Sequence, residues 1–225
     1  MSTLQTLDRG IQALFVVAAR GGLSVPELAA ELGVPRANAY RIVTTLIGHG
    51  LLQRSEDGSL RLGAALPALA SRYWPGFLST AQPILQNLAD HAGATGFVTV
   101  AEGSECVVLM TTEPATPILR VGYRAGSRHP LTIGAAGIAI LAAREPTMND
   151  TPAVVDARRA GYSVTRGQLQ PGAVGVACAI PRNDGSFTVE ASIGIVAMDG
   201  FDVDAAVPLV LLAARSLTEA TASAR

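Results

Sequence analysis

Two short helical patterns with almost no chain between them most restrict how this sequence can fold. Ser24, followed three residues later by Glu27, forms a capping-box signature for a helix that ends at Gly33. A second helix opens at Pro35 after a very short break and ends at Gly48. Two helices joined by so short a turn are typical of a helix-turn-helix unit.

The flanking segments extend this unit. Residues 1–20 predict a preceding helix, because apolar residues recur at spacings of three and four: Leu7, Ile11, Leu14, Phe15 and Ala18. Residues 51–63 predict two short strands around an Asp-Gly turn, which is a hairpin signature. This order predicts a winged helix-turn-helix domain over residues 1–63.

The helix after Pro35 has two contrasting faces. At about 100° per residue, one face is apolar and is expected in the core: Ala39, Ile42, Val43 and Leu46. The segment 35–54 contains no acidic residue, although its flanks do. Carboxylates near phosphates would weaken binding, so we interpret the outer face as a DNA-binding surface rather than an ordinary solvated one. The candidate DNA-binding residues are Ser24, Arg36, Ala37, Asn38, Tyr40, Arg41, Thr44, Thr45 and Arg54.

The side chains on this face have suitable chemistry for DNA. Arg41 suits a phosphate or a guanine, and Asn38 suits an adenine. Tyr40 lies at the edge of the face, where it either faces DNA or packs on the core. The formal net charge of the whole chain is -1, so DNA binding would need this local patch, duplicated by dimerisation.

The composition restricts the chemistry elsewhere. Hydrophobic residues make up 49% of the chain, enough for a substantial core. The chain has no lysine, which excludes a Schiff base or a phosphate-binding loop that needs one. Cys106 and Cys178 lack metal-ligand spacing, and no export signal is visible, so we expect a cytoplasmic protein with reduced thiols. We expect no metal and no cofactor.

The remaining sequence predicts an α+β domain with a mainly antiparallel sheet. Residues 64–76 are expected to form a linker helix, and the second domain covers residues 77–225. Its expected helices lie at roughly 77–92, within "GAAGIAILAAR" (134–144), and at 151–160 and 203–222. Its expected strands are "GFVTVAEGSECVVLMTT" (a pair), "ILRVGY", "GVACAIP" and "FTVEASIGIVA", the last two joined by the hairpin signal "RNDGS".

In the order and spacing of its motifs, the chain resembles IclR-family transcriptional regulators. The N-terminal half carries "LSVPELAAELGVPRANAYRIVTTLIGHGLLQR" followed by "LRLG"; the C-terminal half carries "HPLTIGAAGIAILA", "AGYSV" and "GVACAIP". The resemblance implies a GAF-like (profilin-like) effector domain and a homodimer, with dimers of dimers in some members. It also implies a regulator, a repressor rather than an activator, that binds a pseudo-palindromic operator in double-stranded DNA and responds to a small organic acid.

The resemblance also implies where the effector binds. The Gly-Ala loop before "GIAILA" suits an anion at a helix N-terminus, with close helix packing as the alternative reason for its small residues. In an alignment with the family, the positions of several polar residues that contact the effector are occupied in this chain by Arg166 and by apolar residues. We therefore expect an acid with an apolar or aromatic body. The candidate effector-binding residues are Gly134, Ala135, Ala136, Gly137, Arg166, Gly175, Cys178, Gly194 and Val196.

No pattern indicates catalysis. The chain has no GxSxG or HExxH motif, and His49, His91 and His129 are scattered. We interpret His129 as a structural turn residue rather than a ligand contact. We therefore expect no enzyme, with two alternatives left open: a small-molecule enzyme on a sensor-like α+β domain, and a protein-interaction adaptor.

Overall fold

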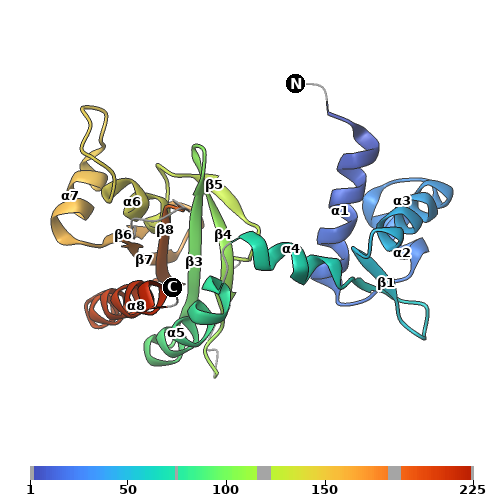
Figure 1. Cartoon of the computed structure of the whole chain (residues 1–225). Coiled ribbons are helices and arrows are strands. Elements are labelled where there is room, and N and C mark those ends of the chain that lie inside the picture. The colour runs from blue at the N-terminus through green and yellow to red at the C-terminus, as the bar shows by residue number, and fades with distance from the viewer. Residues whose placement is uncertain (1–2, 74–75, 116–122, 182–188, 224–225) are drawn as a thin grey trace. The chain divides into compact units, whose positions relative to one another are not determined.

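The computed structural model of the chain describes residues 3–73, 76–115, 123–181 and 189–223 (Figure 1). The chain forms two compact units, Met1–Pro75 and Gly76–Arg225. In the described part, no helix is both long and apolar enough to span a membrane.

The first unit is a three-helix cluster followed by a hairpin and a further helix. Its elements are α1 (Gln5–Arg20), α2 (Val25–Leu32), α3 (Arg36–Gly48), β1 (Leu52–Arg54), β2 (Leu60–Leu62) and α4 (Ala65–Tyr73). The two strands pair antiparallel, and the Asp57 carboxylate accepts a hydrogen bond from the Ser59 N–H at 3.0 Å in the turn between them. The predicted winged helix-turn-helix order is confirmed.

The predicted cap of α2 is also confirmed. The Ser24 hydroxyl accepts a hydrogen bond from the Glu27 N–H at 3.4 Å, and the Glu27 carboxylate accepts one from the Ser24 N–H at 2.7 Å. Gly33 ends the helix with φ 61°, a left-handed conformation that glycine adopts at little cost. This reciprocal cap fixes where α2 begins relative to the turn and α3.

The predicted core face of α3 is confirmed, and α1, for which only a helix was predicted, packs one of its two apolar stripes into the core. The four predicted apolar residues of α3 are all buried: Ala39, Ile42, Val43 and Leu46. In α1 the buried residues are the smaller Ala13 and Val17, whereas Leu7, Ile11 and Phe15 are 60%, 47% and 63% exposed. The helix carries two apolar stripes, and periodicity alone could not tell which one packs against α2 and α3. The larger side chains form the outward stripe.

The second unit is a six-stranded sheet with the order β5-β4-β3-β8-β7-β6, every pair of neighbours antiparallel. The strands are β3 (Thr95–Glu102), β4 (Glu105–Thr112), β5 (Arg128–Pro130), β6 (Ser163–Arg166), β7 (Ala173–Ile180) and β8 (Ala191–Met198). The helices are α5 (Phe77–Ala92), α6 (Ala135–Ala142), α7 (Pro152–Ala160) and α8 (Val203–Ser223). The α+β class with an antiparallel sheet is confirmed.

Helices cover both faces of this sheet (Figure 1). Helices α5 and α8 pack together on one face, and α6 with α7 covers the other. Small residues in the strands let the helices approach: a Cβ on Gly96 would lie 3.0 Å from Leu85 of α5, and one on Gly175 would lie 3.3 Å from Ala135 of α6. Alternate residues of a strand therefore face different helix pairs, which decides which of them reach the site.

The strand predictions fail at the two edges of the sheet. Strands β5 and β6 were not predicted, because three or four residues at an edge carry too little alternation to recognise. The predicted strand "ILRVGY" lies outside the described residues except for Tyr123, which is not in a strand. The "RNDGS" hairpin signal also lies outside the described residues.

Candidate functional site

The outer face of α3 is a continuous exposed surface without carboxylates. All seven candidates on this helix are exposed: Arg36, Ala37, Asn38, Tyr40, Arg41, Thr44 and Thr45. Tyr40 is 48% exposed, so of its two sequence-based placements the outward one is observed. The structure therefore gathers these residues on one surface, with the buried residues of α3 behind them.

The two arginines of α3 are available for a partner. Neither Arg36 nor Arg41 forms an ion pair with any of the residues that the structure describes. The Thr45 hydroxyl donates to the Arg41 carbonyl at 3.0 Å, which leaves its oxygen as an acceptor. The first turn of α3 contains no acidic residue, so the positive end of the helix dipole is not neutralised there.

The other two DNA-binding candidates lie off this helix. Ser24 is half-buried, and its hydroxyl is already bonded to Glu27 in the cap of α2. Arg54 ends strand β1, and its guanidinium donates to the Gly58 carbonyl at 3.5 Å across the hairpin. Arg54 is exposed, whereas the hydrogen bonds of Ser24 stabilise the motif.

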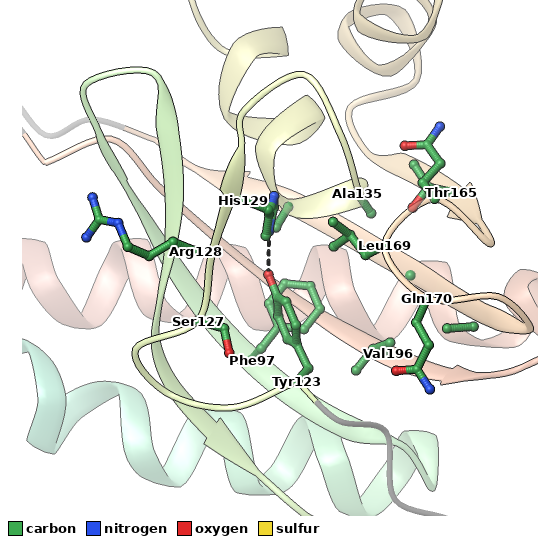
Figure 2. Close-up of a pocket in the computed structure, with 14 residues that line it drawn as sticks. Phe97, Tyr123, Ser127, Arg128, His129, Ala135, Thr165, Leu169, Gln170 and Val196 are labelled. Carbon is green, nitrogen blue, oxygen red and sulfur yellow. Dashed lines mark hydrogen bonds between the residues drawn. The ribbon is translucent and has the colours of Figure 1, made fainter. Parts of the chain in front are cut away.

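A pocket of about 190 Å³ lies in the second unit, on the α6 side of the sheet (Figure 2). Its walls come from strands β3, β5, β6, β7 and β8, from the start of α6, and from the loops before β5 and after β6. The lining residues are Phe97, Tyr123, Ser127, Arg128, His129, Ala135, Ala136, Thr165, Gln168, Leu169, Gln170, Ala173, Gly175 and Val196.

Some of the predicted effector residues do line this pocket. Ala135, Ala136, Gly175 and Val196 are among the lining residues. Gly134 lies at its edge: its N–H donates to the Gln168 side-chain oxygen at 2.8 Å, and a Cβ there would lie 2.6 Å from Leu169. The Gly-Ala loop thus borders the pocket, as the resemblance implied.

Besides Gly134, four predicted effector residues do not line the pocket. In β6, Thr165 is buried and lines it, so the adjacent Arg166 points the other way and is exposed. Cys178 lies on the face of β7 opposite to the pocket-lining Ala173 and Gly175, and its Sγ lies 3.2 Å from the Gly161 carbonyl oxygen. At Gly137 and Gly194, close packing leaves no room for a side chain. A Cβ added at Gly137 would lie 2.7 Å from the Leu131 Cα, and one added at Gly194 would lie 2.7 Å from the Phe97 ring.

Several lining residues were missed by the sequence reasoning. Tyr123 and Ser127 come from the segment leading into the unpredicted strand β5, and Arg128 begins that strand. Gln168, Leu169 and Gln170 come from the loop after the unpredicted strand β6. His129, which we interpreted as a structural residue, also lines the pocket. Apart from the motif "RHPL" around His129, no local pattern marks these residues as lining a site.

Aromatic side chains form the centre of the pocket. The rings of Phe97 and Tyr123 meet edge to face, with centroids 5.1 Å apart and an interplanar angle of 74°. The Tyr123 hydroxyl oxygen lies 2.9 Å from His129 Nε2 (Figure 2). Burial raises the pKa of Tyr123 far above its ordinary value, so the side chain remains a protonated phenol.

The charge on Arg128 is already compensated. Its guanidinium donates to Glu102 at 2.8 Å and to Glu105 at 2.9 Å. These bonds raise the pKa of the arginine, Glu102 contributing most. Figure 2 shows the side chain extending away from the other lining groups.

The structure gives no support to a cysteine nucleophile here. Strand pairing places Cys106 opposite His129, but burial raises the pKa of the Cys106 thiol to about 11. A thiol with that pKa is not ionised near neutral pH, and the thiolate is the nucleophile. Burial also raises the pKa of Cys178. Among the residues that can be described, no three His, Cys, Asp or Glu side chains are grouped as a metal site would need.

Comparisons with known proteins agree with this architecture. Residues 6–56 match the family model of the IclR helix-turn-helix domain. The chain is 27% identical over 144 residues to the "Transcriptional repressor IclR" of Escherichia coli K12, covering 62% of this chain and 53% of that protein. The chain spans about half the length of the named repressors that it matches.

Two solved structures share the fold across almost the whole chain. An IclR homologue from Microbacterium hydrocarbonoxydans, complexed with 4-hydroxybenzoate, has a TM-score of 0.72 at 21% identity, covering 97% of this chain and 99% of that one. An IclR transcriptional regulator from Alicyclobacillus acidocaldarius has a TM-score of 0.70 at 20% identity, covering 98% and 100%.

Proposed function

Since this chain belongs to the IclR family, we propose that it is a sequence-specific DNA-binding transcriptional repressor whose operator affinity changes when a small organic acid binds. The observation that carries the proposal is the exposed, carboxylate-free outer face of α3. That face lies within the segment that matches the IclR helix-turn-helix domain. A protein that acts on operator DNA would work in the cytoplasm.

On this proposal, α3 enters the major groove and β1-β2 reaches the adjacent backbone. Arg41, near the middle of the exposed face, would bond a guanine or a phosphate, and Asn38 would bond an adenine. Arg36 is in the first turn, where the helix dipole also favours a phosphate. Thr44 and Thr45 would contact phosphates or a thymine methyl group.

We further propose that the protein acts as a homodimer. One such unit offers only a few phosphate contacts, and two units on a pseudo-palindromic operator would provide enough for tight binding. Helix α1 supports an association surface, because Leu7, Ile11 and Phe15, with Leu4 just before the helix, form an exposed apolar stripe that no described residue covers. Exposed stripes of this kind commonly mark protein contacts.

The pocket is proposed as the effector site. Its volume and mostly apolar walls suit an acid with an apolar or aromatic body, and a structural neighbour of the same fold holds 4-hydroxybenzoate. Because Arg166 faces away and Arg128 is paired, the carboxylate would be held by neutral donors such as Gln168, Gln170 and the start of α6. Ligand binding would then change the spacing of the two recognition helices in the dimer.

The test is a gel-shift titration of the full chain on DNA from upstream of its own coding region. Arg41→Ala should abolish specific binding, with the melting temperature unchanged. The matched control is Arg159→Ala, which removes the same charge from an exposed position of the second unit. If Arg41→Ala binds with unchanged affinity, the recognition role of α3 is wrong.

A further inference from the structure

The pocket contains a pair of side chains whose hydrogen atoms can be assigned from geometry. The His129 ring is buried, and its two nitrogens each have one neighbour. Nδ1 lies 3.1 Å from the Pro130 carbonyl oxygen, and Nε2 lies 2.9 Å from the Tyr123 hydroxyl. A carbonyl oxygen can only accept, so Nδ1 must carry the hydrogen.

This tautomer fixes the direction of the second hydrogen bond. A neutral imidazole with its hydrogen on Nδ1 has only a lone pair at Nε2. The Tyr123 O–H must therefore donate to His129. The phenolic oxygen then presents only lone pairs to a ligand, so it acts as an acceptor and not as a donor.

The surroundings of this oxygen suit a small ring. Phe97 lies edge-on to Tyr123, and Leu169, Ala135, Ala136 and Val196 supply apolar walls. The cavity of about 190 Å³ is slightly larger than the roughly 150 Å³ engineered cavities that hold benzene. This volume suits one substituted ring.

We propose that Tyr123 and His129 together select ligands with a hydroxyl on a single aromatic ring, the hydroxyl donating to the Tyr123 oxygen. This inference rests on the proposed effector role of the pocket and adds the group that discriminates between ligands. A ligand of the same shape without the hydroxyl hydrogen would leave the acceptor unpaired. Unpaired acceptors at a half-buried site lower affinity by about tenfold.

The experiment is calorimetric titration of the full chain at pH 8 with 4-hydroxybenzoate and, separately, 4-fluorobenzoate, which has nearly the same size but no donor. The wild-type protein should bind the hydroxyl compound about tenfold more tightly. Tyr123→Phe should bring the two affinities together. Tyr162→Phe, which removes a phenol outside the pocket, should keep the tenfold preference.

Three results would overturn the inference: equal binding of the two compounds by the wild-type protein, a preference that survives in Tyr123→Phe, or no binding of either compound. The wild-type comparison decides the matter even if Tyr123→Phe does not fold. Gel shift of the same preparation separates the two proposals. If the protein shifts the DNA band but binds neither compound, only the ligand assignment is wrong. If it binds the hydroxyl compound selectively but does not shift the DNA band, only the DNA-binding function is wrong.

Discussion

Replacing Gly137 by alanine would place a methyl group where α6 approaches the backbone of Leu131. The added Cβ would lie 2.7 Å from the Leu131 Cα and 2.8 Å from its carbonyl carbon, and still closer to its carbonyl oxygen. Real Cβ atoms do not approach backbone atoms so closely, and backbone cannot rotate aside as a flexible side chain can. The helix or the Leu131 segment must therefore move.

Two opposing effects determine the size of the change. Alanine is more favourable than glycine inside a helix by about 1 kcal/mol. Overpacking of a tight core contact costs about 1–3 kcal/mol, and the upper end applies here because every close atom is backbone. The expected net result is a loss of about 2 kcal/mol in the free energy of unfolding of the second unit.

The assay is urea unfolding of the full chain, followed by far-UV circular dichroism. The matched control is Gly10→Ala in α1, where an added Cβ would meet nothing within 4 Å and should stabilise the first unit by about 0.5–1 kcal/mol. The two variants should therefore shift stability in opposite directions. If Gly137→Ala stabilises the protein as Gly10→Ala does, the close-packing explanation for Gly137 is refuted.

Three further perturbations test other parts of the account. Ser24→Ala should lower the stability of the first unit by about 1 kcal/mol, measured by thermal unfolding, because the cap of α2 is lost. Hydrogen bonds from Thr147, with Arg158 adding its charge, lower the pKa of Asp150. Its stabilising effect is complete above the ordinary aspartate pKa of about 4 and is lost as the pH falls through the lowered pKa, so Asp150→Asn should reduce the loss of unfolding free energy on acidification below about pH 4, measured by urea unfolding. Phe15→Ser should shift the solution mass toward the monomer in light scattering, and an unchanged mass would remove α1 from the dimer contact.

The sequence predicted the first unit well because its signals are local. A capping box, a glycine stop and an Asp-Gly turn each depend on neighbouring residues, and all three are present. The helix α1 was also predicted, but it has two apolar stripes, and only the tertiary fold decides that Ala13 and Val17 face inward. A local pattern identifies an amphipathic helix, but not which stripe packs when both are apolar.

The pocket was less predictable because its residues meet only through strand pairing. Ala135 and Ala136 were found from the family motif, whereas Tyr123 and His129 join Phe97 in the pocket wall only once β5 has paired with β4. Arg166 was placed in the site from an alignment position, but the alternation of β6 turns it outward. A shift of one residue along a strand moves a side chain to the other face of the sheet, and the sequence alone could not show which face Arg166 occupies.

The most direct test of the central claim is nuclease footprinting of the full chain on DNA upstream of its own coding region, with and without 4-hydroxybenzoate. The account predicts a protected pseudo-palindromic site with two half-sites about one helical turn apart, and a change in the protein concentration needed for protection when the acid is added. Absence of protection at any protein concentration, at low salt and without ligand, would contradict it.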